Sequence, residues 1–211
     1  MKRLLVAAAL SCLALQGQSF DLSKAQGYVG GGFTEPQAGF GQRHDMGYGV
    51  LAGGGIRISP MISLNVEYSF NKFAYDYKTY LPASVTTTTY HGASEIHGYT
   101  FNPRIHTPPL FKMGTYITGG YGIYDAKFQL DRPSSTTVLC DPYWSQCKPG
   151  TVVPTGWALG QTSTWKGGWN VGLGIEGGKS RVKFFADARY VYVFTANVRT
   201  EYIPVTFGIH F

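Results

Sequence analysis

The sequence has few charged residues and no long apolar run. Asp, Glu, Lys and Arg together make up 14% of its 211 residues. The basic residues are scattered, without a Lys/Arg cluster or a basic helix, and this argues against nucleic-acid binding despite a formal net charge of +6. The longest apolar run, Leu4 to Leu15, is 12 residues, whereas a membrane-spanning helix needs about 20. Helical periodicity is also missing from the remainder, so a helical fold is disfavoured.

The apolar run near the N-terminus predicts an export signal. Lys2 and Arg3 precede the run, and the small residues Gly17 and Ser19 follow it, which is the order found in a cleaved signal peptide. We therefore expect a signal peptide over residues 1–19 and one mature domain over residues 20–211. Cleavage after Gly17 and a buried N-terminal helix are the alternatives.

Cysteine is scarce, and its placement is informative. Removal of the signal peptide would leave Cys140 and Cys147 out of three cysteines. An even number of cysteines in an exported chain favours a disulfide, because the export route is oxidising. Two cysteines without a histidine nearby cannot supply four zinc ligands, so we expect no metal site and no cofactor.

Apolar and polar residues alternate along most of the remaining chain. Between Ile62 and Asn71 every even-numbered residue is apolar and every odd-numbered residue is polar. This period of two continues for about ten residues, the length of a membrane-spanning strand. Five other segments share the pattern, and two less regular segments bring the expected strands to eight. They cover about residues 26–33, 48–58, 62–71, 97–105, 110–128, 165–176, 182–192 and 203–211.

The connections between these segments alternate in length. Short connections are expected at 59–60, 106–109 and 177–180, and longer ones at 34–46, 72–94, 129–163 and 195–200. An up-and-down barrel with short periplasmic turns and long outer loops predicts this alternation. Pro103 and Pro204 fit less well, because proline cannot donate to a strand ladder, so each is expected at a bulge or at the barrel rim.

These patterns predict an all-β fold, an eight-stranded antiparallel up-and-down transmembrane β-barrel. Such a barrel is just wide enough inside for side chains, so the small and polar residues are expected inside and the bulky apolar residues outside, against outer-membrane lipid. A soluble lipocalin-like carrier, with the faces reversed, is an alternative. Six charged residues fall on the inward side and are expected to form an ionic network rather than to line a pore: Arg57, Glu67, Glu176, Lys183, Asp187 and Arg189.

The C-terminal part of the chain carries a family resemblance. The segment from Ile203 to Phe211 has apolar residues at alternate positions and a final aromatic residue, and it resembles the terminal assembly signal of outer-membrane barrels. The segment from Phe184 to Tyr190 resembles the penultimate strand of the OmpA-like and OmpX-like β-barrel family. The resemblance covers the whole mature chain and implies a location in the bacterial outer membrane, without a C-terminal peptidoglycan-binding domain. It also implies that the barrel-assembly machinery recognises Phe207, Ile209 and Phe211.

We therefore predict a non-enzymatic outer-membrane barrel with a structural or surface-interaction role. Six aromatic residues in the expected outer loops could bind a surface ligand or pack the loops together: Tyr75, Tyr77, Tyr80, Tyr143, Trp144 and Trp157. A lipid-modifying enzyme is the alternative, with Ser94, Glu95 and His97 as the candidate catalytic set. Since adjacent residues of a strand point to opposite faces, these three are not expected to form a catalytic site.

Overall fold

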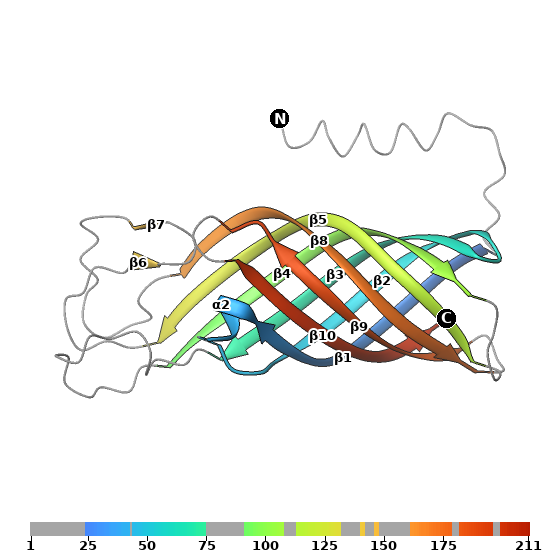
Figure 1. The fold of residues 1–211 in the computed structure, drawn as a ribbon, viewed down its shortest axis with the longest axis horizontal. Helices are drawn as coiled ribbons and strands as arrows, with labels where there is room; N and C mark the ends of the chain where they lie inside the picture. Colours follow the sequence, from blue (N-terminus) through green and yellow to red (C-terminus); the bar gives the residue numbers. More distant parts are fainter. Residues whose placement is uncertain are drawn as a thin grey trace, which may run out of the picture.

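Eight antiparallel strands close into one barrel (Figure 1). A computed structural model describes residues 24–42, 44–74, 91–107, 113–131, 140–141, 146–147, 161–178, 182–195 and 199–211. The expected signal peptide and the six aromatic residues of the expected outer loops lie outside these ranges. The barrel strands are β1 (Ala25–Gln37), β2 (Gly47–Ser59), β3 (Ile62–Ala74), β4 (His91–His106), β5 (Gly114–Asp131), β8 (Gln161–Gly177), β9 (Lys183–Val193) and β10 (Thr200–His210).

The strand order is that of an up-and-down barrel. Each barrel strand pairs with the next one along the chain, and β1 pairs with β10 to close the ring. Two short strands, β6 (Cys140–Asp141) and β7 (Gln146–Cys147), pair with each other, and a four-residue helix, α2 (Ala38–Gly41), follows β1. The predicted fold class and the predicted number of barrel strands are confirmed.

The two ends of the barrel differ, as the connection lengths predict. We call the end that holds the connections after β2, β4 and β8 the short-turn end, and the opposite end the long-loop end. The turn after β4 is longer than predicted, because β4 ends at His106 and β5 begins at Gly114. At this turn Thr107 N donates a hydrogen bond to Thr115 O of β5 at 2.9 Å. At the long-loop end β4 begins at His91 rather than His97, so the sheet extends beyond its apolar stretch.

The faces of the barrel follow the predicted assignment. Inward residues such as Asn65 and Glu67 are 0% and 2% exposed, whereas the outward residues Val66 and Leu173 are both 66% exposed. The outside is therefore apolar and the inside polar, the reverse of a lipocalin-like barrel. An exposed apolar surface that surrounds the whole molecule indicates that lipid, not water, contacts it.

Aromatic rings form a band on this outer surface. Tyr99 stacks on Trp165 with ring centroids 6.0 Å apart, and Trp169 stacks on Tyr192 at 5.7 Å. Aromatic bands of this kind lie at membrane–water interfaces in outer-membrane barrels. No helix within the described ranges is long and apolar enough to cross a membrane.

Pro103 and Pro204 correct the expectation of a bulge or a rim position. The β4–β5 ladder is interrupted beside Pro103 and the β9–β10 ladder beside Pro204, and both ladders resume in the same register. On its other side Pro103 stays paired with Leu64, and Pro204 with Thr34. Since proline lacks only its own N–H, a ladder hydrogen bond is lost on one side of each strand, and the barrel remains closed.

The end of the chain takes part in closing the barrel. Phe211 N donates to Gly27 O and Gly27 N donates to Phe211 O, each at 2.9 Å. The Phe211 ring lies against Gly27, where a Cβ would overlap it. Phe207, Ile209 and Phe211 all point outward, with exposed fractions of 55%, 36% and 63%. Their role as an assembly signal stays a prediction.

We predict that deletion of Phe211 slows barrel assembly and lowers the folded yield. The deletion removes two main-chain hydrogen bonds from the closing pair of strands, together with the outward ring. Folded protein is measured over time in cells as the fraction that migrates faster on detergent gels before boiling. The matched control, Phe211→Leu, keeps the main-chain bonds and so isolates the contribution of the ring. Unchanged assembly kinetics of the truncated chain would contradict the prediction.

Candidate functional site in the barrel interior

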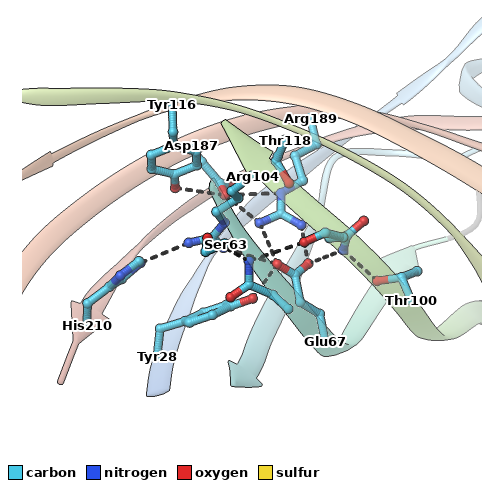
Figure 2. A network of polar contacts seen from close by, with 12 residues as sticks. Tyr28, Ser63, Glu67, Thr100, Arg104, Tyr116, Thr118, Asp187, Arg189 and His210 are labelled. Atoms are coloured by element: carbon cyan, nitrogen blue, oxygen red, sulfur yellow. Dashed lines mark hydrogen bonds and ion pairs between the residues drawn. The ribbon is translucent and has the colours of Figure 1, made fainter. Parts of the chain in front are cut away.

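Glu67 on β3 lies at the centre of a buried ionic cluster (Figure 2). Its carboxylate accepts hydrogen bonds from Arg104 Nη2 at 3.0 Å and from Arg189 Nη2 at 3.3 Å. Arg189 Nη1 and the Tyr28 hydroxyl also donate to it, and Asn102 Nδ2 donates at 2.5 Å. Donors from β1, β4 and β9 therefore converge on one carboxylate of β3.

Asp187 supplies the second negative charge of the cluster. Arg189 Nε and Nη2 donate to Asp187 Oδ2 at 3.0 and 2.6 Å, and the Tyr116 hydroxyl donates to the same oxygen at 3.2 Å. Glu67, Asp187, Arg104 and Arg189 are each 5% exposed or less. Two carboxylates thus balance two guanidinium groups, and the cluster carries no net charge.

Aromatic rings hold Arg104 from two sides. Its guanidinium carbon lies 4.3 Å from the ring centroid of Tyr28 and 4.7 Å from that of Tyr116, which are cation–π distances. Gly53 and Gly174 make room for the two rings, because a Cβ at either position would overlap the neighbouring tyrosine. The glycines of the inward face thus allow large side chains to fill the narrow interior.

The structure separates the six charged residues of the predicted network into three groups. Glu67, Asp187 and Arg189 meet in the central cluster. Glu176 and Lys183 form a separate pair towards the short-turn end, with Lys183 Nζ 3.3 Å from Glu176 Oε1. Arg57 faces the short-turn opening and forms no ion pair with another residue of the described ranges.

Arg104, Tyr28 and Tyr116 are central to the cluster, although the sequence pattern does not single them out. Arg104 follows Pro103, where the strand pattern is weakest. Tyr28 and Tyr116 belong to the two expected strands whose faces the alternation leaves unassigned. The alternation around residue 100 does place Arg104 on the same inward parity as Asn102, but it does not show which residues Arg104 contacts.

His210 continues the polar contacts from the central cluster towards the short-turn end. Arg104 Nη1 donates to His210 Nε2 at 3.2 Å. On the other side of its ring, His210 Nδ1 lies 3.9 Å from Glu176 Oε2. A line of polar side chains therefore reaches from Glu67 to the rim.

An aromatic stopper closes the interior at the long-loop end. Phe40 of α2 stacks on His44 with ring centroids 4.0 Å apart, and Phe40 also meets Phe73 edge to face at 5.1 Å. Phe73 contacts Tyr202 of β10 at 5.5 Å. We refer to these four buried residues as the stopper. Since Phe40 lies in an expected loop, no local pattern in the sequence predicts that it enters the barrel.

The candidate catalytic set of the sequence does not assemble. Ser94 faces the interior and is 1% exposed. His97 faces outward, where its Nδ1 forms a hydrogen bond with the Tyr68 hydroxyl at 2.8 Å. Glu95 is also outside and pairs with Lys72 at 2.9 Å. The three residues therefore share no site.

Two other Ser–His contacts are buried. Ser94 Oγ lies 2.8 Å from Nε2 of the stopper residue His44, and Ser63 Oγ lies 3.2 Å from His106 Nε2 near the short-turn end. Such a pair can act as nucleophile and base, but Ser63 and Ser94 are 0% and 1% exposed and have no route to a substrate here. In the described ranges no three His, Cys, Asp or Glu residues are placed to hold a metal ion.

A closed eight-stranded barrel with an apolar exterior, an aromatic band and a neutral buried ionic cluster defines a small outer-membrane β-barrel. The chain belongs to the family described as the outer membrane protein beta-barrel domain, which matches residues 5–211. Among curated proteins, none is significantly similar to it.

Solved structures share the fold at low sequence identity. Neisserial surface protein A is 12% identical, with 89% of this chain and 96% of that chain covered and a TM-score of 0.58. A major outer membrane protein from Thermus thermophilus is 10% identical, with 89% and 98% covered and a TM-score of 0.53. The attachment invasion locus protein Ail of Yersinia pestis is 14% identical, with 89% and 99% covered and a TM-score of 0.47. The first two of these likenesses show the fold alone.

We predict that Glu67→Gln destabilises the folded barrel by about 3–5 kcal/mol, because it leaves Arg104 buried without a counter-charge. Asp187→Ala should act in the same direction through Arg189. The matched control is Glu95→Gln, which breaks a partly exposed pair on the outer face and should cost about 0–1 kcal/mol. The free energy of unfolding is measured by urea titration of the barrel in detergent. Wild-type urea resistance of Glu67→Gln would show that the cluster is hydrated or dispensable.

Proposed function

We propose that this protein is a non-enzymatic barrel that displays its long loops at the bacterial cell surface, in a structural or surface-interaction role. In this proposal residues 1–19 direct export and are cleaved, and Phe207, Ile209 and Phe211 direct insertion by the barrel-assembly machinery. The filled interior is the observation that supports this proposal. Because the stopper and the ionic cluster fill the barrel, it is suited to displaying loops rather than to transporting solutes.

The interior argues against a channel. The central cluster crosses the barrel, and the stopper lies between it and the long-loop end. A cavity of about 30 Å³ lies between them, beside Glu67 and Tyr202, and it has room for about one water molecule. Eight-stranded barrels have interiors that side chains fill, so this packing is what the strand number predicts.

The buried Ser–His pairs argue against a lipid-modifying enzyme. A catalytic serine must reach its substrate, and its histidine needs a third group to orient it. Phe40 O lies 3.1 Å from His44 Nδ1, but Phe40 and Phe73 cover the Ser94–His44 pair. Catalysis by the Ser94–His44 pair would therefore require Phe40 and Phe73 to move away from it.

We predict that deletion of the gene leaves the composition of lipid A unchanged, measured by mass spectrometry. A loss of envelope resistance to detergent, restored by the wild-type protein, would support the structural role.

The matched variant replaces residues 134–158 with a short Gly/Ser turn. If it restores resistance but not attachment of the cells to surfaces, the long loop carries a separate surface interaction. Altered lipid A, or large single-channel currents from the purified barrel, would contradict the proposal.

The two cysteines lie opposite each other in the connection between β5 and β8. The β6–β7 register pairs Cys140 with Cys147. Residues directly opposite in an antiparallel pair have Cα atoms about 4.5–5.5 Å apart, a separation that a disulfide can span. With the oxidising export route, this register supports a disulfide as part of the proposed surface loop.

We predict that reduction of this disulfide changes the loop without unfolding the barrel. Chain entropy for a ring of about eight residues gives roughly 2.5 kcal/mol at most, and this energy acts within the loop. Mass spectrometry of unreduced peptides tests the bond, and gel migration without boiling tests the barrel before and after reduction. Free, alkylatable thiols in protein isolated from membranes would contradict the bond. Unfolding of the barrel on reduction would contradict its local effect.

A further inference from the structure

A vestibule with an excess of basic side chains opens at the short-turn end. Its volume is about 940 Å³. Arg57 of β2 and Lys183 of β9 line it, together with Lys24, which directly precedes β1. Glu176 is the acidic side chain in the lining, and it is paired with Lys183. Arg57, in contrast, forms no ion pair with another described residue, so the vestibule holds a basic group whose charge an anionic ligand can balance.

An apolar groove of about 530 Å³ lies on the outer face of β8, β9 and β10. The register places the small residue Ala186 of β9 directly between Ile175 of β8 and Phe207 of β10. Phe184, the next outward residue of β9 towards the rim, is 71% exposed. A small residue between larger ones thus forms a furrow in the lipid-facing surface, near the short-turn end.

The vestibule and the groove meet at the rim where β9 begins and β10 ends. Lys183 pairs with His210 across these two strands. Since neighbouring residues of a strand face opposite sides, Lys183 lies on the vestibule side and Phe184 on the groove side. Residue Glu176 borders both cavities. A basic cavity and an apolar furrow therefore lie on the two sides of one sheet edge.

We propose that a glycerophospholipid of the periplasmic leaflet binds over this rim. Its phosphate lies between Arg57 and Lys183, and one acyl chain lies in the groove above Ala186. A soluble anion would use the vestibule alone, and a second copy of the barrel would use the groove alone. A glycerophospholipid has an anionic head joined to an apolar chain. The head suits the basic vestibule and the chain suits the apolar groove, and the two cavities lie on opposite sides of one strand edge.

The orientation of the barrel places this rim where phospholipid headgroups lie. Short turns face the periplasm in bacterial outer-membrane barrels, so the vestibule opens at the periplasmic surface of the membrane. Basic residues at a membrane surface each strengthen the binding of anionic lipid by about fivefold. Two such residues should therefore contribute roughly 25-fold in affinity.

The test is a titration of the full, folded barrel in mild non-ionic detergent with phosphatidylglycerol, followed by native mass spectrometry. We expect one retained lipid per barrel. The double variant Arg57→Gln/Lys183→Gln should lower the lipid affinity roughly 25-fold. Ala186→Trp, or Ala186→Leu if the tryptophan variant does not fold, should lower it by filling the groove. Migration on unboiled gels verifies that each variant is folded.

The matched control is Lys72→Gln/Lys127→Gln, which removes the same charge from the outer face nearer the long-loop end. Its lipid affinity should equal that of the wild type, and an equal loss would overturn the proposal in favour of non-specific charge attraction.

Glycerophosphoglycerol, the soluble headgroup, distinguishes the two sources of phosphate. Full competition by this headgroup, with no effect of the Ala186 variants, would show a site for a soluble anion and overturn the lipid. A loss of lipid affinity in the Ala186 variants but not in the Arg57/Lys183 double variant would also overturn the proposed lipid site, as would the absence of any retained lipid.

Discussion

In the hydrocarbon of a bilayer, every main-chain N–H and C=O group of a spanning strand needs a partner within the protein. The pairing of β1 with β10 supplies the partners that the first and last strands would otherwise lack. Closure with eight strands also makes the interior narrow, so inward side chains from opposite walls meet. The contact between Glu67 of β3 and Arg189 of β9, which are 122 residues apart in sequence, is a consequence of that closure.

Closure sets the electrostatics of the interior in turn. A charge enclosed away from water is costly unless an opposite charge and hydrogen bonds accompany it. Glu67 and Asp187 meet this requirement with Arg104 and Arg189, and the hydroxyls of Tyr28 and Tyr116 each donate a further hydrogen bond to one of the two carboxylates. A one-residue slip of β3 would place Glu67 against lipid, so the cluster also opposes wrong registers.

The two ends of the barrel are closed by different means, and this difference bears on function. The long-loop end is closed by the packed rings of the stopper. The short-turn end stays open as a basic vestibule beside an apolar groove. The same eight strands therefore form a barrel with one closed end and one open end.

The sequence by itself determined the number of strands, the inward and outward faces of six of them and the difference between the two ends. These properties are local, because side chains alternate with a period of two along any strand and turns are encoded by nearby residues. It also placed all six predicted charges on the inward face. Only the tertiary structure decided which of them meet, because contacts across a barrel depend on its shear, the sum of the registers of all strand pairs. For the same reason only the tertiary structure showed that Arg104 meets Glu67 and that Phe40 enters the barrel, because their partners lie on distant strands.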